Sequence, residues 1–315
     1  MRILLVVDGS PYSYIATQML EALQLSPRTE IAVLTVVPKH TILGRITLYQ
    51  AQGSPELRTT QQHQALELVA RYAAALKRIS IKVETLVRWG NTGVQILKAA
   101  KERKAALIIM GSKGLNDLPT LRLSDAAQTV MRHAKASVLL VRENADVGDR
   151  TTPPKKKMAI NRILLATDNS RQSDNVIRFL LELPLPQPCE VIVVTALHSQ
   201  TAALIKTPTL DLQTNQELMA NLQTTEEREA QKIVAHAEKQ FQAKGYRAAS
   251  VVIRGGPAES ILAAAKEYKP DIIALGSQGM NNLEVLGLGN VAGTIARYAN
   301  CSVLIGRTAK NPVTY

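Results

Sequence analysis

The chain has 315 residues, of which 46% are hydrophobic but only 3% aromatic, so its cores must be built from aliphatic side chains. Its length predicts about two domains of roughly 100–200 residues each, and no apolar run approaches the roughly 18 residues of a membrane span. We therefore expect a cytoplasmic protein without a membrane partner. Apart from the cluster Lys155–Lys157, the net charge of +12 is scattered along the chain, so specific nucleic-acid binding is not expected.

The first half of the chain recurs in the second half. "MRILLVVDGS" (1–10) returns as "NRILLATDNS" (161–170), and "LIIMGSKGLND" (107–117) returns as "IIALGSQGMNN" (272–282). The offset grows from 160 to 165 residues, so the second copy carries five extra residues between its second and third strands. A repeat of this length indicates a duplicated domain. We expect domains at residues 1–142 and 161–308, joined by the polar linker 143–160.

Each copy alternates short apolar runs with helical patterns. The runs are nearly continuous Val, Ile and Leu, which predicts parallel strands buried on both faces. They span residues 3–7, 31–37, 82–87, 107–110 and 137–141, then 163–166, 191–197, 250–253, 272–275 and 302–305. Helical spacing relates Ala65, Val69, Tyr72, Leu76 and Ile79, and likewise Ala230, Ile233, Val234, Ala237 and Phe241. The alternation predicts an α/β fold with two tandem doubly wound parallel five-stranded sheets, a Rossmann-like arrangement.

Further signals mark the starts of helices. Ser10, Ser124 and Asn290 each stand where an N-cap is expected. Right-handed crossovers place a ligand crevice at the carboxyl ends of the strands. The turns after the first and fourth strands of each copy lie on that edge.

The segment "GSQGMNNLEVLGLGN" (276–290) follows the fourth strand of the second copy. Gly276 and Gly279 would let the backbone approach an anion without interference from a Cβ atom. Gly289 and Asn290 begin the last helix, whose free N–H groups and dipole attract phosphate. These features favour a phosphate site, with ordinary turn glycines as the alternative.

The first copy departs from this pattern. "GSKGLNDLPTLRLSD" (111–125) keeps Gly111 and Gly114 but has Ser124 and Asp125 at the start of the last helix. The Asp125 carboxylate would interact with the positive end of the helix dipole, which would otherwise attract a phosphate. It would also repel a phosphate by about 4 kcal/mol, for unit charges 4 Å apart at an effective dielectric of 20. We therefore predict a degenerate site that binds nucleotide weakly or not at all.

These residues resemble the universal stress protein family. Its ATP-binding members carry G-x2-G-x9-G-[S/T] after the fourth strand, and the second copy matches every glycine while placing Asn290 at the last position. The turns Asp8-Gly9-Ser10 and Asp168-Asn169-Ser170 also resemble the family, as does Gly255-Gly256-Pro257-Ala258-Glu259. The resemblance covers both copies, so the chain looks like a tandem member.

The resemblance implies an adenine nucleotide, ATP with or without Mg²⁺, in the second copy. Ala166, Thr167 and Asp168 would lie beside the ribose and adenine, and Ala196 would line the adenine through its backbone. The ribose and phosphates would contact Leu275, Gly276, Gly279, Gly289, Asn290 and Val291. The degenerate first site would comprise Asp8, Val36, Gly111, Gly114, Ser124 and Asp125. For Asp168 the alternative is an Asx turn that caps the next helix.

The sequence contains no assembled general base, P-loop or histidine pair with metal-ligand spacing. No catalytic or metal-binding residue is therefore assigned, and any ATP hydrolysis is expected to be slow. Three functions stay open. They are a stress-response or signalling module in which ATP controls binding to an unknown protein partner, a slow Mg-ATP hydrolase, and a nucleotide-free interaction protein.

The last strand of each copy, at residues 137–141 and 302–305, is short and β-branched. Family members often dimerise through such strands. The resemblance therefore implies an intramolecular pseudo-dimer of the two domains, with a homodimer of whole chains as a further possibility.

Overall fold

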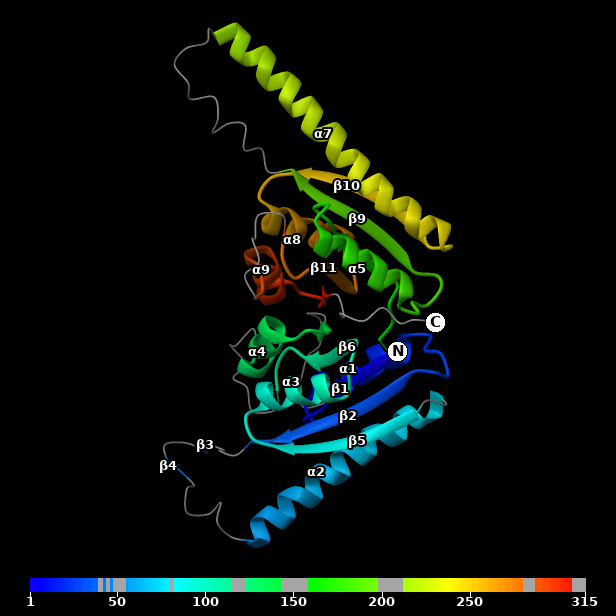
Figure 1. Cartoon of the computed structure of the whole chain (residues 1–315), viewed down its shortest axis with the longest axis vertical. Helices are drawn as coiled ribbons and strands as arrows, with labels where there is room; N and C mark the ends of the chain where they lie inside the picture. Colours follow the sequence, from blue (N-terminus) through cyan, green and yellow to red (C-terminus); the bar gives the residue numbers. More distant parts are fainter. Residues whose placement is uncertain are drawn as a thin grey trace.

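The computed structural model describes residues 1–38, 42–43, 46–47, 55–79, 82–114, 123–142, 158–197, 212–279 and 287–307. Its main feature is a single ten-stranded sheet with helices on both faces (Figure 1). Most of the expected linker, residues 143–160, falls outside the described ranges. The predicted α/β architecture is confirmed, but the two expected five-stranded sheets are joined into one.

The strands follow the repeat closely. Those of the first copy are β1 (Arg2–Val6), β2 (Glu30–Val37), β5 (Lys82–Trp89), β6 (Leu107–Gly111) and β7 (Ser137–Val141). Those of the second are β8 (Arg162–Ala166), β9 (Glu190–Leu197), β10 (Arg247–Arg254), β11 (Ile272–Gly276) and β12 (Ser302–Gly306). The order across the sheet is β10-β9-β8-β11-β12-β7-β6-β1-β2-β5. A separate hairpin pairs β3 (Ile42–Leu43) with β4 (Ile46–Thr47).

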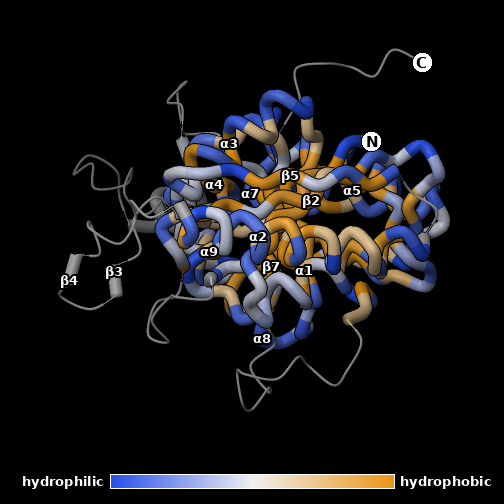
Figure 2. Tube along the Cα trace, turned by 90° about the horizontal axis from the view of Figure 1, so that it is seen from below, coloured by the Kyte–Doolittle hydropathy of each residue, from blue (hydrophilic) through white to orange (hydrophobic). Residues whose placement is uncertain are grey.

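Two helical layers cover the sheet and bury one core on each face. One face carries α1 (Pro11–Ala22), α2 (Pro55–Leu76), which runs into the 3-10 turn η2 (Lys77–Ile79), α5 (Arg171–Glu182) and α7 (Leu212–Ala243). The other carries α3 (Thr92–Glu102), α4 (Asp125–His133), α8 (Pro257–Tyr268) and α9 (Asn290–Tyr298). Figure 2 shows the hydrophobic segments gathered in the centre with hydrophilic segments around them. None of the helices in the described ranges is long and apolar enough to cross a membrane.

The central strands are aliphatic because they supply both cores. In β1, Ile3 and Leu5 point to one core while Leu4 and Val6 point to the other, as the two-residue repeat of a strand requires. Most of the helical residues predicted from periodicity are also buried, with Val69 and Leu76 in α2 matching Val234 and Phe241 in α7, whereas Ile233 is only partly buried.

The outermost strands differ from the prediction. β5 and β10 contain no buried residue, although both were expected to be buried. The reason is their place in the sheet, since each pairs on one side only, with β2 and β9 respectively. Both are longer than expected, because they pair with these neighbours along eight residues.

The two copies meet where β7 lies antiparallel to β12. Leu139 pairs with Leu304 at the centre of this junction, and Val138 and Leu140 pair with Ile305 and Val303. Leu139 and Leu304 are themselves equivalent in the repeat, so the junction has an approximate twofold axis. The internal pairing of the copies expected from the terminal strands is therefore present.

A reciprocal pair of arginines reinforces the junction. The Arg142 guanidinium, from the first copy, donates to the carbonyl oxygens of Ala296 and Ala299 at the end of α9. Its repeat equivalent, Arg307, donates to the carbonyl oxygens of Met131 and Ala134 around the end of α4. The last carbonyls of a helix lack partners within the helix. Each copy thus completes the last helix of the other.

Gly306 gives a test of packing beside this junction. Its equivalent in the first copy is Val141. A Cβ atom on Gly306 would lie 3.1 Å from the Val176 Cα atom and closer still to the Val176 side chain. We predict that Gly306→Ala lowers the free energy of unfolding by about 1–3 kcal/mol, because the core would be overpacked. Urea unfolding measures this. Adding Val176→Ala should recover part of the loss, whereas strictly additive losses would contradict the packing explanation.

Candidate functional site

The predicted site residues lie where the strand order of the second copy reverses. β8 is flanked by β9, which follows it in the chain, and by β11, which is the third strand after it. Because β8 and β11 are parallel, the loops that follow them leave the same edge of the sheet. In open α/β sheets such a switch point is the usual ligand crevice. The first copy repeats the arrangement between β1 and β6.

Asp168 and Gly279 bring the two loops of the second copy together. A Cβ atom on Gly279 would lie 2.7 Å from the Asp168 Oδ2 atom, so the half-buried carboxylate lies against this glycine. The other oxygen, Oδ1, accepts a hydrogen bond of 3.0 Å from the Ser170 amide. Asp168 therefore makes the Asx-type turn considered from the sequence. At the same time it turns one oxygen toward the glycine loop.

Gly276 and Gly111 have a packing role. A Cβ atom on Gly276 would lie 3.1 Å from the backbone carbon of Gln172 in α5, and one on Gly111 would lie 2.6 Å from the Tyr12 Cβ atom in α1. Both copies need this close approach of strand and helix. The first glycine of the motif alone therefore does not distinguish a phosphate site from a turn.

The start of the last helix does distinguish the two copies. In the first copy the N-cap is Ser124, whose Oγ atom accepts a hydrogen bond of 3.0 Å from the Ala127 amide. In the second copy the N-cap is Gly289, which has no side chain to cap Ala292, the equivalent of Ala127. The backbone is otherwise the same, with φ and ψ of −70° and 157° at Ser124 and −66° and 159° at Gly289.

The prediction that Asn290 is an N-cap is wrong. Asn290 is the first residue of α9 and is exposed to solvent. The N-cap position before it is occupied by Gly289. Asp125 likewise begins α4 and is exposed. The first copy is thus capped by Ser124, with the Asp125 charge one residue further on.

The other predicted residues lie around the candidate site at the carboxyl edge of the sheet. Ala166, Thr167 and Leu275 are buried, while Ala196 and Val291 are partly buried. Leu275 and Val291 belong to the core between the sheet and α8 and α9. In the first copy Val36 packs against the same core, and Gly114 is the last described residue before residues 115–122.

One difference between the copies gave no sequence signal. The Ser13 hydroxyl donates a hydrogen bond of 2.6 Å to Asp8, whereas the equivalent Ser173 hydroxyl donates to the Ser170 carbonyl at 2.8 Å. The residue pattern Asp-x-Ser-x-x-Ser is identical in both copies. The motif residues are the same in both copies, so the motif itself does not indicate this difference.

Comparisons with known proteins agree with this architecture. The model of the universal stress protein family matches residues 1–142 and 159–307. The chain belongs to the universal stress protein family. It is 28% identical over 149 residues to the universal stress protein YxiE of Bacillus subtilis, an alignment that covers 47% of this chain and 99% of YxiE. Two matches thus lie in tandem, as the repeat predicted.

Solved structures of similar length share the fold. A universal stress protein from Archaeoglobus fulgidus superposes with a TM-score of 0.64 at 18% identity, covering 99% of this chain and 97% of its own. The functionally unknown protein PA1789 from Pseudomonas aeruginosa gives a TM-score of 0.60 at 14% identity, with 98% and 92% covered.

Within its described residues, this universal stress protein has no group of three or more His, Cys, Asp or Glu side chains that could hold a metal ion. Burial raises the pKa of Cys189 to about 11 and that of Cys301 to about 12. Both thiols therefore stay protonated near neutral pH, and neither is suited to act as a thiolate nucleophile.

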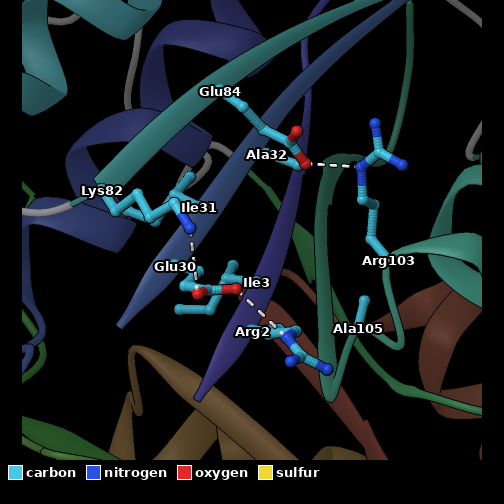
Figure 3. A pocket seen from close by; sticks show the side chains of 9 residues that line it. All are labelled: Arg2, Ile3, Glu30, Ile31, Ala32, Lys82, Glu84, Arg103 and Ala105. Atoms are coloured by element: carbon cyan, nitrogen blue, oxygen red, sulfur yellow. Dashed lines mark hydrogen bonds and ion pairs between the residues drawn. The ribbon is translucent and has the colours of Figure 1, made fainter. Parts of the chain in front are cut away.

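A cavity of about 420 Å³ lies at the opposite edge of the first copy (Figure 3). It is lined by Arg2, Ile3, Glu30, Ile31, Ala32, Lys82, Glu84, Arg103 and Ala105. Arg2 and Lys82 pair with Glu30 at 3.2 and 3.4 Å, and Arg103 pairs with Glu84 at 2.5 Å. Because these charges largely neutralise one another at the amino ends of the strands, we place the candidate site at the carboxyl edge instead.

The unequal N-caps predict unequal mutational effects. Ser124→Ala should lower the free energy of unfolding by about 1 kcal/mol, because the Ala127 amide loses its acceptor. Gly289→Ser should raise it by a few tenths of a kcal/mol, roughly the advantage of serine over glycine at an N-cap. Urea unfolding without nucleotide measures both. A loss on Gly289→Ser would show that the α9 start does not accept this cap.

Proposed function

We propose that the protein binds ATP at the carboxyl edge of its second copy and acts as a regulatory module in stress response or signalling. The observation that carries this proposal is the start of α9. Its N-cap, Gly289, leaves the Ala292 amide without a side-chain acceptor, while the same position in the first copy is capped by Ser124. A helix N-terminus without a side-chain cap beside a switch-point crevice favours a bound anion.

The expected roles follow the geometry of the edge. The terminal phosphates accept hydrogen bonds from the first amides of α9, at Asn290, Val291 and Ala292, and from the Asn290 side chain. The Gly276–Gly279 turn approaches the inner phosphates and ribose, with Leu275 beneath. The Asp168 carboxylate accepts from a ribose hydroxyl.

The adenine lies over Ala166 and Thr167, beside the backbone of Ala196. Mg²⁺ would accompany the phosphates and offset their charge. Gly276 and Gly279 have no Cβ atom, and the first amides of α9 have no side-chain cap, and both features suit a polyphosphate.

We propose that the two copies are the domains 1–142 and 161–308, with residues 143–160 as the linker. The first domain serves as a scaffold, because Ser124 caps its helix and the Asp125 carboxylate opposes a phosphate. ATP occupancy would change affinity for a protein partner or for a second copy of the chain. Such a regulator needs free ATP, which places it in the cytoplasm.

Isothermal titration calorimetry with Mg-ATP tests the assignment. We expect one ATP per chain, and Gly289→Ser should weaken binding about tenfold, because its hydroxyl takes the Ala292 amide and a hydrogen bond to a charged group is lost. Asp125→Ser should not create a second site, since Ser124 still caps α4. Two equal sites would refute the asymmetry, and no binding at all would refute the function.

The loop contact gives a second test with a matched control. Gly279→Ala places a Cβ atom where the Asp168 carboxylate lies, whereas a Cβ atom on Gly287 meets nothing within 4 Å. We predict that Gly279→Ala weakens ATP binding about tenfold or more, as for the loss of a charge-assisted hydrogen bond, while Gly287→Ala has little effect. Equal affinities in the two variants would exclude Asp168 and Gly279 from the site.

A further inference from the structure

Helix α9 connects the candidate phosphate site to the junction of the two copies. Its N-terminus begins at the Gly289 cap, and its C-terminal carbonyls at Ala296, Arg297 and Ala299 accept hydrogen bonds from Arg142. With nine residues the helix is only about 13 Å long, so its two ends lie close together. At its other end the Gly289 amide donates a hydrogen bond of 2.8 Å to the Ser277 carbonyl, so residues outside the helix contact both of its ends.

Arg142 belongs to the first copy, and the sheet fixes its place. It directly follows β7, and because β7 runs antiparallel to β12 its backbone lies beside the start of β12. The Arg142 amide donates a hydrogen bond of 3.2 Å to the Ser302 Oγ atom. The guanidinium therefore reaches α9 from a rigid base that is not part of the second copy.

We propose that Arg142 is a positioning residue for the second-copy nucleotide site, so that the first copy completes the site it does not itself contain. This inference rests on the proposed binding of ATP at the start of α9. Arg142 does not touch the nucleotide. It holds the far end of the helix whose first amides meet the terminal phosphates.

Two physical effects act in the same direction. A planar guanidinium that binds several carbonyls fixes the tilt and rotation of the helix end more tightly than a flexible ammonium. A cation at the C-terminus also complements the helix dipole, as phosphate does at the N-terminus. Since coupling is reciprocal, bound ATP should in turn strengthen the contact of α9 with the first copy.

The repeat supplies a matched control in Arg307. This arginine makes the equivalent contacts to Met131 and Ala134 around the end of α4, and it is partly buried like Arg142. The N-terminus of α4 is capped by Ser124. Loss of Arg307 should thus disturb the junction to a similar degree without disturbing the phosphate end of the nucleotide site.

The test compares Arg142→Ala, Arg142→Lys and Arg307→Ala in the full chain, with ATP and AMP as ligands in calorimetry and urea unfolding as the check on folding. We expect Arg142→Ala to weaken ATP binding about threefold to thirtyfold, and AMP binding less, because the terminal phosphates lie on α9. Arg142→Lys should fall between Arg142→Ala and wild type. Arg307→Ala should bind ATP within about twofold of wild type, with a similar loss of stability.

The outcomes separate the inference from the function on which it rests. Wild-type protein that fails to bind ATP overturns the proposed function and this inference with it. ATP binding that weakens equally in Arg142→Ala and Arg307→Ala overturns the inference alone, because both arginines would then act only through the junction. Equal weakening of ATP and AMP in Arg142→Ala also overturns it. If Arg142→Ala fails to fold, Arg142→Lys compared with Arg307→Lys gives the same decision.

Discussion

The antiparallel pairing of β7 with β12 is the constraint on which the rest of the structure depends. Without it, each copy would end in an unpaired aliphatic strand edge, a surface prone to association with other chains. The register has little freedom, because a slip of one residue would turn Val138 and Leu140 from one core to the other. The same register sets Arg142 and Arg307 against helix ends of the opposite copy. Sheet continuity and the fit between the copies thus have one cause.

On this common frame the two copies differ at the start of their last helix in the chemistry of a few side chains. Ser124 and Gly289 share nearly the same backbone angles, so the N-caps differ by a hydroxymethyl group and not by a conformation. A single oxygen satisfies the Ala127 amide in one copy, and its absence leaves the equivalent Ala292 amide without a side-chain cap in the other. The charge at the start of the last helix also differs, because α4 begins with the negatively charged Asp125 and α9 begins with the neutral Asn290.

Much of this was predictable from sequence because the signals are local. Aliphatic runs gave the strands, helical spacing gave the buried faces of α2 and α7, and the repeat gave the second copy from the first. The predictions that fail depend on where a residue lies in the fold, which a local sequence pattern does not show. Burial of β5 and β10 depends on their place at the sheet edges, which a run of residues does not encode. Asn290 was assigned as a cap because its side chain suits one, whereas the Gly289 backbone takes that position. The Asp168–Gly279 contact joins loops more than a hundred residues apart, so no local pattern could indicate it.

A duplicated chain also removes a limit that a symmetric dimer faces. In a homodimer every substitution appears in both subunits, so a change that closes one site closes the other. Here Ser124 and Asp125 stand in one copy only. Arg142 binds the C-terminal end of α9, and Arg307 binds that of α4, so a substitution can change one contact without the other. If α9 binds the phosphates, the first copy does not bind ATP itself but supports the helix that does. Its last helix is capped by its own Ser124, and Arg142 extends from the end of β7 to hold the C-terminal end of α9.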